Sequence, residues 1–184
     1  LIVNGSQQGI DLVARSLLQP GDTVLTEEPS YLAALQVFAS YEAAVRPVRT
    51  DAEGMDVEAA AAALRGAGVK LLYVMPSHQN PSGATLSESR RRPLLEAALA
   101  AGVPVLADEA YLDLRYDPGE PTPLAAAHPE APVISLGTFS KTIAPGLRVA
   151  WLAGPAAVVA RLALLKQVAD LHTGSLTQRL VHRY

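Results

Sequence analysis

The chain has 184 residues, of which 49% are hydrophobic, enough for one domain, or a large part of one, with a substantial core. The formal net charge of -3 gives no global basic field of the kind that favours nucleic-acid binding. The chain contains no cysteine, which excludes disulfides and thiolate metal sites and fits a cytoplasmic protein. No apolar run approaches the roughly 20 residues that a membrane span requires.

Short apolar runs alternate with helical patterns along the whole chain. Strands are predicted at Thr23–Leu25, Ala44–Val48, Lys70–Met75, Val103–Ala107, Val133–Leu136 and Val149–Leu152. Several of these runs show no polar alternation, which is typical of strands covered on both faces.

Helices are predicted between these strands. The apolar spacing from Ile10 to Leu18 indicates a helix that Pro20-Gly21 ends. Asp56 is expected to cap a helix that closes at Gly66 or Gly68, and Ser87 to cap one that Gly102 stops. Another helix is expected to begin near Pro155. Strands alternating with helices predict an α/β fold with a mainly parallel sheet and helices on both faces.

In such sheets ligands bind beyond the carboxyl ends of the strands, so the residues that follow each strand are candidates for a site. After Leu1–Val3 comes NGSQQ, which leads into the first helix. Ser6 is a plausible N-cap there. Alternatively, the free N–H groups of the helix start bind an anion such as phosphate, and Gly5 lets the backbone approach it closely.

The run PSHQNPSG follows the strand that ends at Met75. Asn80-Pro81 and Ser82-Gly83 are ordinary turn residues, but an asparagine fixed by a following proline can also direct its amide at a ligand. His78 has no second histidine or carboxylate at ligand spacing, so no metal site is expected.

The sequence DEAY follows the strand that ends at Ala107. A carboxylate at the end of a buried strand is costly to desolvate unless a cation or several donors meet it, so Asp108 requires a positive partner. Tyr111 can present its hydroxyl to the same region. The alternative is that Asp108 caps a helix start.

The fourth cluster is GTFSKTIAPGLR, in which Thr138 and Ser140 flank Lys141 and Arg148 follows seven positions later. Arginine suits bidentate phosphate contacts, and lysine becomes a nucleophile when its surroundings lower its pKa. The alternative is a solvated loop lysine with an arginine at the next strand edge. A nucleotide-binding P-loop is excluded, because that motif needs glycine before the lysine and a long helix after it, whereas Pro145-Gly146 follows here.

The four clusters together fit the requirements of pyridoxal 5'-phosphate. This cofactor needs an amine that can form an imine, an anion for its pyridinium nitrogen and donors for its phosphate. Lys141, Asp108 and the NGSQQ and SKT segments offer these groups, and a protonated ring nitrogen is the cation that Asp108 otherwise lacks.

With the motifs GSQQ, EPSY, NPSG, DEAY and SK followed by arginine, in this order, the chain resembles the fold-type-I, class I/II pyridoxal-phosphate-dependent aminotransferases. The runs APGLR and ADLHT make it similar to the subgroup of α-aminoadipate and kynurenine aminotransferases. The resemblance implies the three-layer α/β/α large domain of that fold, which moves an amino group from an amino acid to a 2-oxo acid through a lysine-bound aldimine.

The resemblance also implies residue roles. Lys141 would hold the cofactor and move the substrate proton, and Asp108 would pair with the ring nitrogen. Asn80 and Tyr111 would contact the ring's phenolic oxygen, and Tyr31 would stack on the ring face. Lys141, Asp108 and Tyr111 are therefore the expected catalytic residues. The expected phosphate contacts are Ser6, Gln7, Thr138, Ser140 and Arg148.

We expect residues 1–184 to be the cofactor-binding large domain of a longer chain, because the sequence starts and stops within apparent structural elements. In the family, an N-terminal arm and a C-terminal small domain complete the substrate site, and the full-length protein would be a homodimer with no nucleic acid or membrane partner. Two alternatives stay open. One is an aminotransferase-like ligand-sensing domain of a winged-helix transcription regulator, and the other is a different pyridoxal-phosphate reaction on the same fold.

Overall fold

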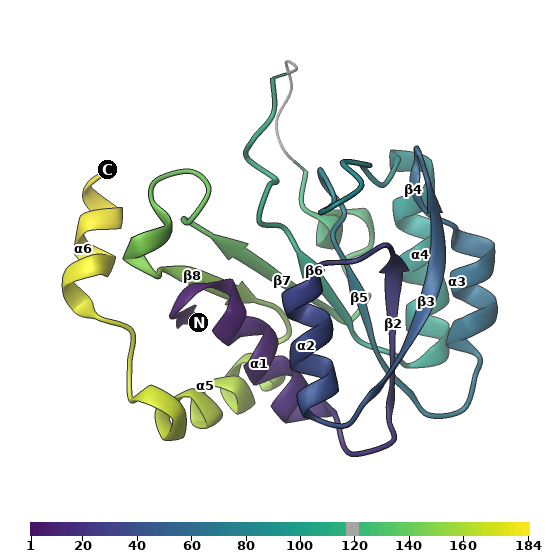
Figure 1. Cartoon of the computed structure of the whole chain (residues 1–184), viewed down its shortest axis with the longest axis horizontal. Helices are drawn as coiled ribbons and strands as arrows, with labels where there is room; N and C mark the ends of the chain where they lie inside the picture. Colours follow the sequence, from purple (N-terminus) through teal and green to yellow (C-terminus); the bar gives the residue numbers. More distant parts are fainter. Residues whose placement is uncertain (117–121) are drawn as a thin grey trace.

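The structure is a computed structural model that describes residues 1–116 and 122–184. Its centre is an 8-stranded sheet with the order β1-β8-β7-β6-β5-β2-β3-β4 (Figure 1). The strands are β1 (Ile2–Val3), β2 (Thr23–Glu28), β3 (Ala44–Asp51), β4 (Gly54–Met55), β5 (Val69–Val74), β6 (Val105–Asp108), β7 (Val133–Thr138) and β8 (Ala150–Ala153).

The central part of the sheet is parallel and its margins are antiparallel. Strands β3, β2, β5, β6 and β7 run parallel to one another, whereas β8 pairs antiparallel with β7, β1 with β8, and β4 with β3. The predicted mainly parallel α/β architecture is therefore confirmed. Every predicted strand is present with one or both ends shifted; β1 lies within the apolar run Leu1–Val3 that precedes NGSQQ, and the short β4 is additional.

Helices cover both faces of the sheet, as predicted (Figure 1). The covering helices are α1 (Gly5–Leu17), α2 (Leu32–Ser40), α3 (Val57–Leu64), α4 (Glu88–Ala101) and α5 (Ala156–Asp170). Helix α6 (Ser175–Arg183) stands apart from the sheet and has no buried residue, and short 3-10 turns lie at η1 (Leu124–Ala127) and η2 (Pro145–Leu147). None of the helices in the described ranges is long and apolar enough to cross a membrane.

The core is divided by the sheet into two apolar clusters. Helices α1, α2 and α5 pack on one face and α3 and α4 on the other. Successive residues of β5 alternate between the clusters: Leu71 and Tyr73 belong to the first, Leu72 and Val74 to the second. Because side chains of a strand point alternately to the two faces, a stretch buried on both sides favours apolar residues at every position, which explains the run LLYVM from Leu71 to Met75.

The helix ends agree with the sequence in part. Asp56 caps α3 by accepting a hydrogen bond from the Ala59 N–H at 2.9 Å, and Gly102 ends α4 with a positive φ of 67°. Helix α3 ends at Leu64 with Arg65 as its C-cap, so Gly66 follows the helix end directly, as expected. One expectation is wrong, because the N-cap of α1 is Asn4 rather than Ser6, which already lies within the helix.

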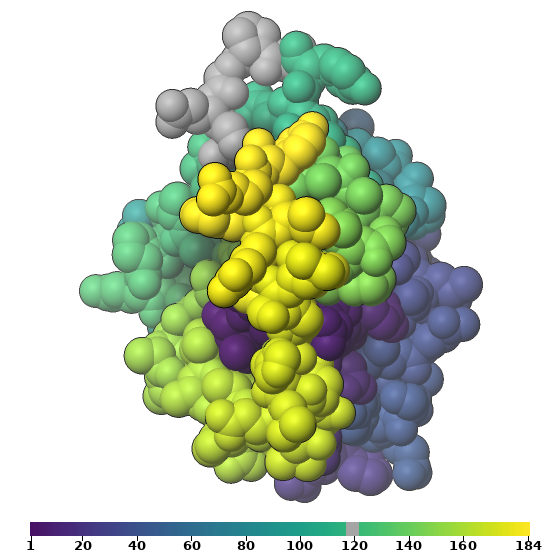
Figure 2. Space-filling model, turned by 90° about the vertical axis from the view of Figure 1, so that its left-hand side faces the viewer, coloured from purple at the N-terminus to yellow at the C-terminus, as the bar shows by residue number. Residues whose placement is uncertain are grey.

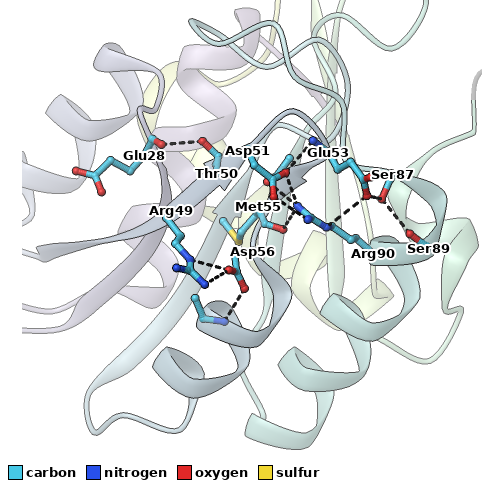
Figure 3. Close-up of polar contacts among 12 residues, drawn as sticks. Glu28, Arg49, Thr50, Asp51, Glu53, Met55, Asp56, Ser87, Ser89 and Arg90 are labelled. Atoms are coloured by element: carbon cyan, nitrogen blue, oxygen red, sulfur yellow. Dashed lines mark hydrogen bonds and ion pairs between the residues drawn. The ribbon is translucent and has the colours of Figure 1, made fainter.

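Ser87 precedes α4 as predicted, but its hydroxyl makes no cap hydrogen bond. It contacts Glu53 and Ser89 instead, in the polar cluster shown in Figure 3. In the same cluster Arg90 donates to both oxygens of Asp51 at 2.7 and 2.8 Å. These contacts join the β3–β4 hairpin to α4, on the side of the sheet opposite α1.

Candidate functional site

A pocket lies at the carboxyl ends of β5, β6 and β7, beside the start of α1. The residues lining it are Ser6, Gln7, Tyr31, Met75, Asn80, Asp108, Ala110, Tyr111, Thr138, Ser140, Lys141, Pro145 and Arg148. Every site residue predicted from the sequence is among them. The structure thus brings together side chains from segments far apart in the chain, and their individual roles stay predictions.

One wall of the pocket is suited to an anion. Gly5 begins α1 with a φ of +77°, and a Cβ there would lie 2.0 Å from Arg148 Nη2. The guanidinium therefore lies directly against the helix start, where free N–H groups favour negative charge. Arg148 Nη1 is also 3.5 Å from Ser140 Oγ, which accepts a hydrogen bond from Thr138 Oγ1 at 3.1 Å.

Arg148 is held in an uncommon backbone conformation. Its φ is +53°, in the left-handed region that favours glycine, and its backbone N–H donates to the carbonyl oxygen of Pro145. The side chain also donates to that carbonyl, at 3.2 Å. The 3-10 turn η2 thus fixes both the backbone and the guanidinium of this residue, which directs a positive charge at the start of α1.

Asp108 forms the floor of the pocket and is 2% exposed. Its Oδ2 accepts a hydrogen bond from the Tyr73 hydroxyl at 2.8 Å, whereas Oδ1 has no hydrogen-bond partner among the described residues. Burial raises the pKa of this carboxyl to about 6, against the opposing effects of Tyr73, the Ala110 N–H and Lys141. An unpaired, buried carboxylate oxygen fits a cationic N–H donor of a ligand.

The alternative that Asp108 caps a helix is wrong. Strand β6 ends at Asp108 and a series of turns follows it, so no helix starts there. These turns bring Tyr111 back over the pocket, where the Lys141 Nζ lies 5.5 Å from the centroid of its ring. Lys141 forms no ion pair with any carboxylate of the described residues, which leaves its amine available to a ligand.

Sequence reasoning missed Gln79, which lies behind the pocket and is 2% exposed. Its Nε2 donates to the carbonyl of Pro29 at 2.7 Å, and its Oε1 accepts from the Ser82 N–H and hydroxyl at 2.8 and 2.6 Å. This one amide therefore joins the loop before Tyr31 to the loop that carries Asn80. Its neighbours in the sequence gave no signal for this role, because Pro29 lies in a loop 50 positions earlier in the chain.

Glu27 was also missed, although a carboxylate within an apolar strand is itself a signal of a special environment. It is 2% exposed, and its Oε2 accepts a hydrogen bond from the Met75 N–H at 2.9 Å. Burial raises the pKa of Glu27 to about 8, against hydrogen bonds from Met75 and Gln79, and nearby Asp108 raises it further. The Glu27 side chain is therefore mostly protonated at neutral pH.

A polar cluster outside the pocket holds the start of α1. Asp170, at the end of α5, accepts hydrogen bonds from Asn4 and Gln8 and pairs with the buried Lys166 at 2.6 Å. Figure 2 shows the C-terminal segment (yellow) next to the N-terminal one (purple). Asn4 and Gln8 flank Ser6 and Gln7, so α5 fixes the position of the anion-binding wall.

Nothing in the described ranges groups three or more histidine, cysteine, aspartate or glutamate residues in a way that could hold a metal ion.

Comparison with known proteins agrees with this geometry. The family model for aminotransferase class I and II matches residues 1–181. The aromatic-amino-acid aminotransferase 1 of Thermococcus litoralis is 40% identical over 190 residues, which cover 100% of this chain and 45% of that protein. An uncharacterized HTH-type transcriptional regulator of Bacillus subtilis is 39% identical, over 97% of this chain and 37% of its own length.

Among solved structures, the α-aminoadipate aminotransferase of Thermus thermophilus, complexed with N-(5'-phosphopyridoxyl)-L-leucine, superimposes with a TM-score of 0.93 at 38% identity. The match covers 100% of this chain and 48% of that one. The chain thus spans about half the length of the aminotransferases that it matches.

Proposed function

The chain belongs to the aminotransferase class I and II family, and from this premise we propose that it is the cofactor-binding large domain, residues 1–184, of a pyridoxal-phosphate-dependent aminotransferase. The whole protein would move an amino group from an amino acid to a 2-oxo acid. The observation that carries the proposal is that the unpaired Oδ1 of buried Asp108 and the amine of Lys141 share one pocket with an anion-binding wall.

The residues present fit the cofactor. A buried carboxylate oxygen without a donor suits the protonated ring nitrogen, and a cradle in which only glycine leaves room for Arg148 suits the phosphate. When bound, pyridoxal phosphate supplies an electron sink that makes the α-proton of an amino acid acidic. Lys141 has no carboxylate partner in the described ranges, which leaves its amine free to bond the cofactor.

The protein residues would then have separate tasks. Asp108 would keep the ring nitrogen protonated, and Lys141 Nζ would take the substrate α-proton and return it. Asn80 and Tyr111 would donate to the ring oxygen, and Tyr31 would cover the ring face and exclude water from it. The phosphate would be bound by Ser6, Gln7, Thr138, Ser140 and Arg148, all of which line the pocket.

Further properties of the whole protein are proposed from its relatives. Their names support aromatic amino acids or α-aminoadipate as amino donors. We also propose a cytoplasmic homodimer without a nucleic-acid partner. Size measurement of the full-length protein by light scattering tests the dimer, and a monomeric mass would contradict it.

The central test uses the full-length protein with Lys141→Ala and the control Lys70→Ala, which removes an exposed lysine of β5 outside the pocket. Wild type and control should show the visible absorbance of a lysine imine and lose it on borohydride reduction, with the cofactor covalently attached. Lys141→Ala should show neither. A reducible imine that persists in Lys141→Ala would contradict the assignment of this lysine.

The second candidate is the ligand-sensing domain of a winged-helix transcription regulator, which the 39% identity to the Bacillus subtilis regulator supports. The cofactor residues serve both functions, so the discriminating experiment is a screen of amino donors with 2-oxoglutarate. Formation of glutamate supports the enzyme. Retained cofactor with no transfer from any donor, together with specific DNA binding by the full-length protein, supports the regulator.

A further inference from the structure

Resting on the proposed function, we propose that Tyr73 is a positioning residue for cofactor recognition. Its hydroxyl occupies Oδ2 of Asp108, so that the carboxylate stays ionised and presents Oδ1 alone to the ring nitrogen of the cofactor. Tyr73 does not line the pocket, and no motif in the sequence marks it. Its effect would be exerted entirely through Asp108.

The register of the sheet brings the two side chains together. Tyr73 of β5 pairs with Leu106 of the parallel strand β6, and both belong to the same apolar cluster. Asp108 lies two residues beyond Leu106 and therefore points to the same face of the sheet. The Tyr73 hydroxyl reaches Asp108 Oδ2 at 2.8 Å, and both residues are almost fully buried.

The tyrosine ring is fixed in place by its packing. Phe38 of α2 meets it edge to face, with ring centroids 5.6 Å apart and an interplanar angle of 69°. Burial, followed by the nearby Asp108 charge, raises the pKa of Tyr73 well above 10. The hydroxyl therefore stays protonated, and by donating to Asp108 Oδ2 it favours the ionised form of this carboxyl.

The other groups around Asp108 do not replace this donor. The Lys141 amine and the Ala110 N–H favour the charged carboxylate, and Glu27 and Glu109 oppose it when ionised. Among the influences that lower the pKa of Asp108, the Tyr73 hydrogen bond is the largest. A hydrogen bond to a charged group corresponds to about one to two pKa units. Loss of the hydroxyl would thus raise the pKa of Asp108 further, so that more of this carboxyl is protonated at neutral pH, and a neutral acid forms no ion pair with a pyridinium.

The test compares Tyr73→Phe with Tyr41→Phe in the full-length protein. Tyr41 is a matched control, because its hydroxyl also donates to an aspartate, Asp11, at 2.9 Å, but lies outside the pocket. The affinity of each apoprotein is measured for pyridoxal phosphate and for its carbocyclic analogue, in which CH replaces the ring nitrogen. The analogue keeps the aldehyde and the phosphate but has no ring N–H to pair with Asp108.

We expect Tyr73→Phe to bind pyridoxal phosphate about tenfold more weakly at pH 7, with the acidic limb of binding shifted up by about one pH unit. Binding of the analogue should change less than about twofold, and Tyr41→Phe should change neither ligand. An equal loss for both ligands would mean that Tyr73 only supports the fold, and no loss for either would also overturn the inference. Difluorotyrosine at position 73 is a better hydrogen-bond donor of similar volume, so it should lower the pH below which pyridoxal phosphate binding weakens. If that pH does not change, the proposal is contradicted, even where Tyr73→Phe folds poorly.

Failure of the proposed function gives a different result. If the wild-type protein binds neither ligand and shows no lysine imine, the cofactor assignment is wrong and this inference is overturned with it. If the wild type binds both ligands with an imine, the ratio of the two affinities in Tyr73→Phe decides the inference alone.

Discussion

The Gln79 side chain donates to the carbonyl oxygen of Pro29 at 2.7 Å, across 50 positions of sequence. This contact joins the two loops that carry Asn80 and Tyr31 behind the pocket. The same amide accepts two hydrogen bonds from Ser82, so every polar atom of a nearly buried side chain is used. We infer that the relative position of Asn80 and Tyr31 depends on this one residue.

Replacement of this amide should loosen the site. Gln79→Ala leaves the Pro29 carbonyl and the Ser82 N–H without their partner, at a cost of about 1–3 kcal/mol in the free energy of unfolding. Cofactor affinity should fall about tenfold or more, because both loops lose their alignment. Urea denaturation and cofactor titration measure the two effects. The control, Gln167→Ala on the exposed face of α5, should change neither; unaltered cofactor binding in Gln79→Ala would show that the loops are held by other contacts.

The buried carboxyl of Glu27 should make stability depend on pH. Its pKa is about 8 in the folded protein against 4.5 as the ordinary value, so the native state binds the proton more tightly. The stabilisation that this protonated group contributes is complete below pH 4.5 and is lost as the pH rises through about 8.

Glu27→Gln removes this titration while keeping an acceptor for the Met75 N–H. The variant should show a flatter decline of the unfolding free energy between pH 5 and 9 and be more stable than wild type at the alkaline end, by an amount on the order of a few kcal/mol. Unfolding measured across this pH range checks the prediction. Parallel profiles for wild type and variant would mean that Glu27 ionises normally in the fold.

The start of α1 should tolerate no side chain at position 5. Gly5→Ala imposes an alanine on a φ of +77° and drives its Cβ into the Arg148 guanidinium. We expect loss of most phosphate-dependent cofactor affinity, since the arginine must leave the anion-binding wall.

Gly21→Ala separates the effect of backbone strain at a positive φ from the effect of a Cβ that displaces Arg148. Its φ is +86°, but a Cβ there meets nothing within 4 Å, so only the backbone strain of about 1–2 kcal/mol applies. Both variants should be destabilised in thermal unfolding, but only Gly5→Ala should bind pyridoxal phosphate weakly. Equal cofactor affinity in the two variants would contradict the arrangement of Gly5 and Arg148.

The buried ion pair of α5 should matter far more than an exposed one of the same spacing. Asp170→Ala leaves Lys166 as an uncompensated charge with 5% of its side chain exposed, and also removes the acceptor of Asn4 and Gln8. We expect a loss of about 3–5 kcal/mol in the free energy of unfolding.

The matched control is Glu96→Ala, which breaks the Arg92–Glu96 pair of α4, whose side chains are 64% and 50% exposed. That change should cost no more than about 0.5 kcal/mol. Chemical denaturation of both variants measures the difference, and comparable losses would show that Lys166 reaches solvent when its partner is removed.

Local sequence signals located the strands and the pocket residues but not the helix cap of α1. Serine is a common N-cap, so Ser6 was the natural expectation, yet the helix begins earlier, after Asn4. The Asn4 side chain donates to Asp170 instead of capping the helix, and the backbone N–H of Asn4 donates to Gln8 Oε1. A partner near the far end of the chain thus takes up the Asn4 side chain, and Ser6 and Gln7 of the first helical turn line the pocket.

The sequence by itself determined the alternation of strands and helices, and with it the site, because the carboxyl ends of parallel strands meet at one edge of the sheet. Asp108, Lys141 and Asn80 could therefore be placed together from their positions after apolar runs. Only the tertiary structure decided what supports them. Asp108 depends on Tyr73, 35 positions away, and the start of α1 depends on Asp170, 166 positions from Asn4. Buried polar groups take whichever partner the packing brings within about 3 Å, and no local pattern specifies that distance.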